Sequence, residues 1–163
     1  MPSWRSLFRD ATELLCSVSL CFCGVVLVQP LPFSHKAHVA LGQNCLDCHT
    51  MPEPGDLATY PAEARCMSCH SAIKADSPAI RKLTEFYKKQ KPIPWVRVYK
   101  IPDFVFFSHK QHFRQAKIAC ETCHGPVGAR DVITLEKPTS MVACMDCHDQ
   151  MGASVACNFC HNP

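Results

Sequence analysis

The chain has 163 residues and a mass of 18.2 kDa, which suits one domain or two small ones. Its formal net charge of +3 is mild and does not favour a nucleic-acid-binding protein. Thirteen cysteines are too many for an ordinary cytosolic protein, and they indicate a disulfide scaffold, metal sites or covalently attached haem.

The first predicted element is an apolar stretch, Leu14 to Val28, which follows Arg5 and Arg9. Basic residues before an apolar stretch are typical of a secretory signal. The stretch is short for a membrane span, which usually takes about 20 apolar residues, and no small-x-small cleavage site follows it. We expect export to the periplasm, with residues 1–30 either removed as a signal or kept as an inner-membrane anchor. Three cysteines of this stretch are interpreted as small apolar residues: Cys16, Cys21 and Cys23.

The next element, FSHKAHVALGQNCLDCH from Phe33 to His49, places two histidines before a C-x-x-C-H motif, and CMSCH follows at Cys66. The same order recurs in FSHKQHFRQAKIACETCH from Phe107, with CMDCH following at Cys144. A further motif, CNFCH at Cys157, closes the second copy alone. Repetition on this scale implies a duplicated module.

Between the copies, SPAIRKLTEFYKKQ predicts a short amphipathic helix with Ser77 as N-cap and Pro78 at its first position. KPIPWVRVYKIP then alternates apolar and polar residues and predicts a short strand flanked by prolines. Three lysines at the helix end suit the helix dipole and are interpreted as a solvated face, with a partner-docking patch as the alternative. These lysines are Lys88, Lys89 and Lys91.

Ten cysteines form five C-x-x-C pairs, and a histidine directly follows each pair. Neither a disulfide framework nor a tetrahedral zinc site requires that histidine, so a structural zinc protein is the weaker alternative. A c-type haem does require it, because two thiols bind the porphyrin and the adjacent imidazole is held beneath the iron. The sequence therefore predicts five covalently bound haem c groups. The predicted attachment cysteines are Cys45, Cys48, Cys66, Cys69, Cys120, Cys123, Cys144, Cys147, Cys157 and Cys160, with His49, His70, His124, His148 and His161 as iron ligands.

Four histidines remain outside the motifs, and they form two pairs with a spacing of three residues: His35, His38, His109 and His112. On a helical turn the two members of a pair project from one face, so they bind different irons and draw two porphyrins together. Five irons thus share four distal histidines. One haem has another ligand or an open coordination position. With 13 prolines and weak periodicity elsewhere, the chain is mostly loop, and the haems must form its core.

The F-S-H-K-x-H sequence before C-x-x-C-H, with a closing cluster of two motifs, resembles the class III multihaem cytochromes c, and the second copy is similar to their three-haem members. The resemblance implies a mostly irregular fold with few short helices, and an N-terminal apolar helix is expected besides. The expected divisions are a signal or anchor at 1–30, a dihaem module at 31–75, a helix–strand linker at 76–106 and a trihaem module at 107–163. The implied distal ligands are His35 for the haem at Cys45, His38 for that at Cys66, His109 for that at Cys120 and His112 for that at Cys144.

The chain departs from the three-haem pattern in PTSMVAC, where those proteins place a histidine and this chain has Met141. We expect Met141 to be the second ligand of the haem at Cys157, with Met151 or an open site as alternatives. Methionine in place of a second histidine raises the reduction potential of a haem.

PIPWVRVYKIPDFVFFSHKQH and CETCHGPV resemble the membrane-anchored pentahaem cytochromes of alternative complex III and its relatives. This resemblance implies a periplasmic electron carrier that serves a membrane-bound, quinol-linked oxidoreductase complex, with redox proteins as partners and membrane contact through the N-terminal segment. The competing interpretation is an enzyme that reduces nitrite, hydroxylamine or peroxide at an open haem at Cys157. No spare His, Tyr or Arg near Cys157 offers a proton donor, so we expect no catalytic residues.

Overall fold

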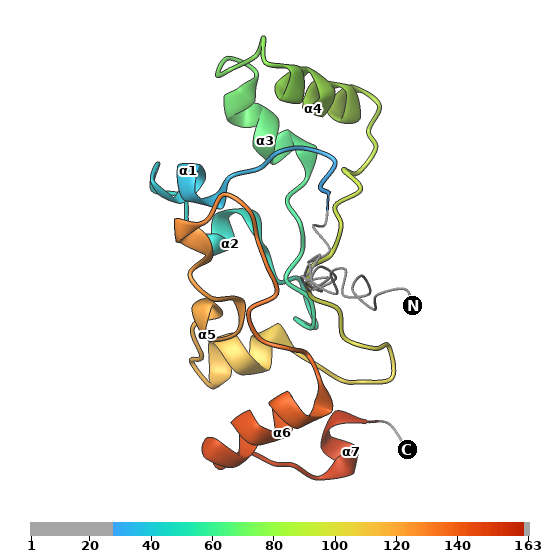
Figure 1. Cartoon of the computed structure of the whole chain (residues 1–163). Helices are drawn as coiled ribbons and strands as arrows, with labels where there is room; N and C mark the ends of the chain where they lie inside the picture. Colours follow the sequence, from blue (N-terminus) through green and yellow to red (C-terminus); the bar gives the residue numbers. More distant parts are fainter. Residues whose placement is uncertain (1–27, 162–163) are drawn as a thin grey trace, which may run out of the picture.

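The computed structural model describes residues 28–161, so all but residues 28–30 of the predicted signal or anchor, including its three cysteines, lie outside the described residues. Short helices joined by irregular segments make up this part of the chain, which is elongated, with α3 and α4 at one end and α6 and α7 at the other (Figure 1). No helix between residues 28 and 161 is both long and apolar enough to cross a membrane. The helices are α1 (His35–Val39), α2 (Cys45–Cys48), α3 (Glu63–His70), α4 (Pro78–Lys88), η1 (Lys110–Gln115), α5 (Cys120–His124), η2 (Val127–Ala129), α6 (Met141–Gln150) and α7 (Cys157–Cys160).

The apolar core of the polypeptide is small and lies at the α3–α4 end. Leu31, Leu83 and Ile93 are buried, and Met67 of α3 and Trp95 pack against them. Elsewhere in the described residues large apolar side chains remain exposed, many of them on α6 and α7 and before the second copy. A chain that buries so little apolar surface depends on its prosthetic groups for a core. The sequence predicts a mostly irregular chain with few short helices, and the structure confirms this fold class.

The predicted helix between the copies is confirmed as α4. The hydroxyl oxygen of Ser77 accepts a hydrogen bond from the Ile80 amide at 3.2 Å, and Pro78 occupies the first turn. Leu83 is the buried residue of the apolar face that the sequence pattern predicts.

The predicted strand after α4 is wrong, because residues 92–98 pair with no other strand in the described part of the chain. Pro92 and Pro94 have no amide hydrogen to donate to a neighbouring strand. The side chain of Gln29 instead bonds both backbone groups of Val96, donating to its carbonyl at 2.9 Å and accepting from its amide at 3.0 Å. This contact ties the start of the described chain to the segment after α4.

The second copy of the repeat is one residue longer than the first, and the structure places that residue in a π-helix. Phe33 to His49 contains 17 residues, whereas Phe107 to His124 contains 18. The first copy forms an α-turn at α1, while in η1 the amide of Ala116 donates to the carbonyl of Gln111, five residues earlier, at 2.9 Å. A π-turn is the usual way for a helix to hold one extra residue.

Candidate haem sites

The first histidine of each copy faces the histidine of the nearest C-x-x-C-H motif. The ring centres of His35 and His49 are 6.3 Å apart, with the ring planes at 10°. The ring centres of His109 and His124 are 6.4 Å apart, with the planes at 6°. The two copies therefore repeat not only the residues but also the spatial relation between them.

The second histidine of each copy faces the histidine of a different motif. His38 lies 6.2 Å from His70 of α3, and His112 lies 6.0 Å from His148 of α6, measured between ring centres. The structure thus brings together the four histidine pairs that the class III resemblance implies. The two histidines of one helical turn point to two different motifs.

The spacing of these rings fits one metal ion between two imidazoles. With metal–nitrogen bonds of about 2.0–2.1 Å and ~1.1 Å from nitrogen to ring centre, two opposed ligands have their centres roughly 6.3 Å apart. All ten motif cysteines are free thiols, so each motif also offers two sulfur atoms for covalent attachment. The donor set of each motif, two thiols and one imidazole, fits haem c.

Seven of the histidines place Nδ1 against a backbone carbonyl oxygen. A carbonyl oxygen only accepts hydrogen bonds, so Nδ1 carries the proton and Nε2 keeps its lone pair for a metal. Such a contact also fixes the ring orientation and raises the basicity of the ligand. The contacts are His38 to Ser34 at 2.7 Å, His49 to Thr59 at 2.8 Å, His70 to Ile73 at 2.9 Å, His109 to Asp56 at 2.8 Å, His112 to Ser108 at 2.8 Å, His148 to Ser154 at 2.7 Å and, at the longer distance of 3.4 Å, His161 to Phe104.

His35 and His124 are held neutral by their surroundings. Burial, together with the neighbouring His49 and His38, lowers the pKa of His35 to about 4. Burial also lowers the pKa of His124, followed by the effects of His109 and His49. His35 Nδ1 is buried without a hydrogen-bond partner among the described residues. A neutral imidazole is the form that binds a metal, so this burial also suits the predicted role.

The sequence reasoning missed the role of the phenylalanine that opens each copy. Phe33 contacts His35 edge-on at 4.8 Å and stacks on His38 at 4.4 Å. Phe107 repeats both contacts with the histidines of the second copy, at 4.9 Å and 4.6 Å. Each phenylalanine therefore holds both distal histidines of its copy in place. Its recurrence in the repeat was the available signal.

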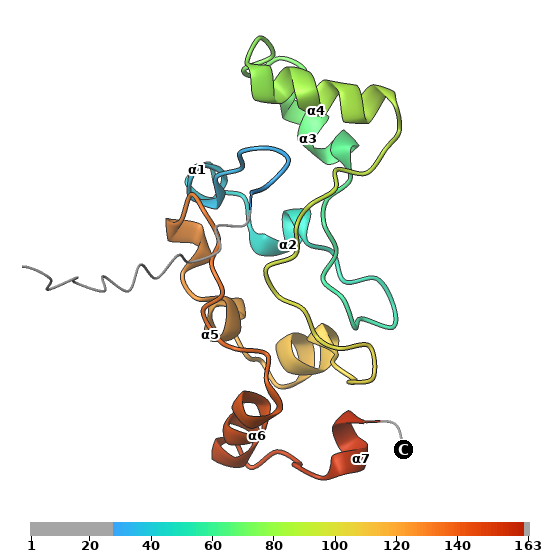
Figure 2. The same ribbon diagram turned by 45° about the vertical axis from the view of Figure 1, so that its right-hand side comes forward.

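The motifs lie next to one another in space in an order that differs from their order in the chain. In four cases burial raises the pKa of a motif thiol, and a cysteine of a neighbouring motif raises this pKa further. The neighbours are Cys66 with Cys48, Cys120 with Cys45, Cys123 with Cys147 and Cys144 with Cys160. The series runs from α3 through α2, α5 and α6 to α7, which agrees with the positions of these helices along the long axis (Figures 1 and 2).

The two copies are joined by a loop of the first copy, residues 53–56. The carbonyl of Gly55 accepts a hydrogen bond from the Lys110 amide at 2.9 Å, and Lys110 Nζ forms an ion pair with Glu53 at 2.6 Å. The carbonyl of Asp56 accepts the Nδ1 proton of His109. A distal histidine of the second copy is therefore positioned by the first copy.

The last motif differs from the other four. The ring centre of His161 lies 5.9 Å from that of Phe104, and the backbone pairs with the segment before the second copy through Phe106 N to Cys160 O at 2.7 Å. Met141, the first residue of α6, is 63% exposed, and the sulfur of Met151 accepts from the Cys147 thiol at 3.9 Å. Among the ring pairs of residues 28–161, His161 has no opposing histidine, and its second ligand stays a prediction.

This chain is similar to a known protein family and to a known cytochrome subunit. Residues 105–162 match the family model described as cytochrome c7 and related cytochrome c. The multihaem cytochrome c subunit of a menaquinone reductase from Nitratidesulfovibrio vulgaris (strain Hildenborough) is 39% identical over 98 residues, which is 59% of this chain. The matched segment covers 45% of that relative, less than half of its length. The region matched by the family model contains the second copy of the repeat and the last three C-x-x-C-H motifs.

Proposed function

We propose that the chain is a multihaem c-type cytochrome of the class III type and that it carries electrons along five covalently bound haem c groups. The family match of residues 105–162 and the 39% identical relative support this assignment. The observation that carries this proposal is the set of four facing histidine pairs at 6.0–6.4 Å, each with one member in a C-x-x-C-H motif. Four irons would have two histidine ligands each, and such six-coordinate irons change oxidation state without binding a substrate.

The haem irons, when bound, supply the one-electron chemistry. The residues of this chain attach the porphyrins, supply the axial nitrogens and fix their orientation. Carbonyl oxygens hold Nδ1 of seven imidazoles. Phe33 and Phe107 keep both distal rings of each copy in place. Rings that are held in this way need little rearrangement when the charge on the iron changes.

The proposed electron path runs along the spatial order of the motifs. Its ends are the haem at Cys66, beside α4, and the haem at Cys157, in α7. The thiol neighbours that join successive motifs support this order, because porphyrins attached at adjacent cysteines lie close together. Electrons would enter at one end of the molecule and leave at the other.

For the haem at Cys157 we propose Met141 as the second ligand, which would give it the highest reduction potential of the five. Met141 stands where the three-haem members of the resembled family place a histidine, which supports Met141 over Met151. A higher potential at this end would favour the collection of electrons there.

We further propose that the protein works in the periplasm as a subunit or partner of a membrane-bound, quinol-linked oxidoreductase complex, with residues 14–28 as the membrane contact. The similar relative is by name a menaquinone reductase subunit, which supports this partner class. The apolar stretch after Arg5 and Arg9 supports export.

Two measurements on the haem-loaded protein test the function. The mass of the intact protein, with its alkaline pyridine spectrum, is expected to give five covalent haems; four or fewer would remove the proposed path. Carbon monoxide added to the dithionite-reduced protein is expected to leave the Soret band unchanged, because all five irons have two protein ligands. A change in about a fifth of the haem absorbance would indicate an open iron opposite His161, and would favour the small-molecule reductase.

A further inference from the structure

We propose that the basic face of α4 is the docking surface for an acidic electron-transfer protein that exchanges electrons with the haem at Cys66. This proposal rests on the proposed function and names a partner class for one end of the electron path. The basic face consists of the exposed residues Arg81, Lys82, Lys88, Lys89 and Lys91.

The two ends of the path differ in charge. Residues 63–91 contain seven Lys or Arg and three Asp or Glu, whereas residues 138–161 contain two Asp and no Lys or Arg. Such a separation of charge along one molecule gives each end a different class of partner. An acidic protein is steered to the α4 end, and the opposite end repels it.

Much of the positive charge on this face is not neutralised within the described residues. Lys89 pairs with Glu85 at 3.4 Å, but both side chains are about two-thirds exposed, so the pair is weak and screened by solvent. Lys82 Nζ donates to the carbonyl of Pro30 at 2.9 Å, a contact that keeps its charge. Lys88 and Lys91 form no ion pair with residues 28–161.

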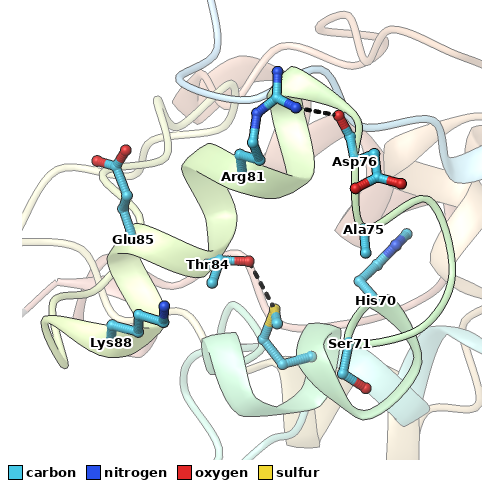
Figure 3. Close-up of a pocket in the computed structure, with 9 residues that line it drawn as sticks. His70, Ser71, Ala75, Asp76, Arg81, Thr84, Glu85 and Lys88 are labelled. Carbon is cyan, nitrogen blue, oxygen red and sulfur yellow. Dashed lines mark hydrogen bonds between the residues drawn. The ribbon is translucent and has the colours of Figure 1, made fainter.

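A hollow of about 500 Å³ lies between α3 and α4 and leads from this face to the terminal motif (Figure 3). Arg81 and Lys88 of α4 line one side, and His70, the motif histidine, lines the other together with Met67. A partner seated over the hollow therefore lies beside the iron ligand of the terminal haem.

The same hollow favours a protein over a lipid surface. Two carboxylates, Asp76 and Glu85, line it next to the basic residues. A protein partner can present a few basic groups to these carboxylates within an acidic surface, whereas the headgroups of an anionic membrane cannot.

Stopped-flow kinetics with reduced plant-type ferredoxin, a small acidic iron–sulfur protein, test the proposal on the haem-loaded full chain. Oxidation of the ferredoxin cluster releases one electron, and one ferric haem is reduced. We expect K88E/K91E to slow this step at least ~fivefold at low salt and to weaken its dependence on ionic strength. The neutral variant K88Q/K91Q is expected to show a smaller effect in the same direction.

The matched control is K100E/K117E, which makes the same change in net charge at exposed lysines outside α3 and α4. It is expected to change the rate less than ~twofold. Equal slowing by both double variants, or no slowing by either, overturns the proposal. So does a K88E/K91E protein that keeps its rate with ferredoxin but loses binding to phosphatidylglycerol vesicles, since its lysines then face lipid.

The haem content and dithionite reduction of each sample separate this proposal from the one on which it rests. A wild-type protein with too few haems refutes the proposed function before any partner is added. If the protein carries all its haems and is reduced by dithionite, but its rate of reduction by ferredoxin is the same with and without Lys88 and Lys91, the docking surface alone is refuted.

Discussion

The two copies of the histidine repeat hold their imidazoles in almost the same geometry although one copy is a residue longer. The stacking distances of Phe33 on His38 and Phe107 on His112 differ by 0.2 Å, with ring planes at 21° and 23°. The extra residue lies in η1, after the histidines, and does not disturb them. The fold therefore preserves the relation between histidines and motif, while the helix type adapts.

The copies differ in what supports their ligands. In the first copy Thr59 accepts the Nδ1 proton of the motif histidine His49, and the distal His35 has no partner for Nδ1 among the described residues. In the second copy the distal His109 has such a partner, Asp56, which belongs to the first copy. The second copy therefore depends on the first for the position of a ligand.

The copies also differ in the helices that come after them. The first copy is followed by α3 and α4, which enclose the small apolar core of Leu31, Leu83 and Ile93. The second copy is followed by α6 and α7, which contain no buried apolar residue. One end of the molecule is thus held partly by side chains, and the other end relies on its prosthetic groups.

The largest expected effect comes from preventing haem attachment. In the chain produced without haem, we expect loss of cooperative unfolding and of nearly all protection from amide hydrogen exchange, because little else forms a core. Residual protection is expected in α3 and α4 rather than in α5 to α7. Hydrogen exchange followed by mass spectrometry of peptides measures both ends, and native-like protection around α6 would show that this end does not rely on haem.

Leu83→Ala tests the opposite end of the molecule, where α3 and α4 enclose the small apolar core. Leu83 is 4% exposed, and removal of a buried leucine side chain costs about 2–5 kcal/mol in the free energy of unfolding. We expect this loss in the α3–α4 end, measured by hydrogen exchange of the haem-loaded protein, with no change in α6. Leu41→Ala serves as control, because Leu41 is 78% exposed and its loss should cost less than about 0.5 kcal/mol.

The sequence was sufficient to predict the helix that became α4, and it also led to the histidine pairs that the structure brings together. Both depend on local patterns: a cap, an apolar face, and fixed distances between histidine and cysteine. The strand after α4 was wrongly predicted, because alternation of Val96 and Val98 with polar residues says nothing about a partner strand. The partner turned out to be the side chain of Gln29, 67 residues away.

The spatial order of the motifs could not be predicted from the sequence. The motif at Cys66 is second in the chain but lies at one end of the series, because the first motif, in α2, neighbours the motif of the second copy in α5 (Figure 1). The loop at Gly55 also joins the two copies, and its interaction with Lys110 spans 55 residues. No local pattern encodes such a long-range pairing. The difference in charge between the two ends of the molecule became apparent only from the spatial order of the motifs.

Replacement of one distal histidine by methionine tests whether the copies are equivalent. His38→Met and His112→Met each change the second histidine of a copy, and methionine raises the potential of the haem that it ligates. We expect one haem in each variant to shift upward on the order of 0.1 V, a fraction of the roughly 0.8 V range that axial ligands span. Spectroelectrochemical titration measures the shift. Unequal shifts, or carbon monoxide binding in one variant alone, would show that the copies hold their ligands differently.

The smallest expected effect isolates one contact between the copies, that of the loop at Gly55 with Lys110. Gly55 has a positive φ of 94°, and a Cβ atom there would lie 2.5 Å from the Cβ of Lys110. Gly42 also has a positive φ, of 84°, but a Cβ atom there would meet nothing within 4 Å. Both alanine variants therefore carry the strain of a left-handed backbone, of about 1 kcal/mol, and Gly55→Ala alone also displaces the second copy.

We expect Gly55→Ala to lower the free energy of unfolding by about 1–2 kcal/mol more than Gly42→Ala does. The same variant should shift the potential or the electron paramagnetic resonance spectrum of the haem at Cys120, because the loop that moves contains the Asp56 carbonyl bonded to His109. Gly42→Ala should leave that spectrum unchanged. If both variants behave alike, the loop at 53–56 does not position His109, and the second copy holds its own ligands as the first does.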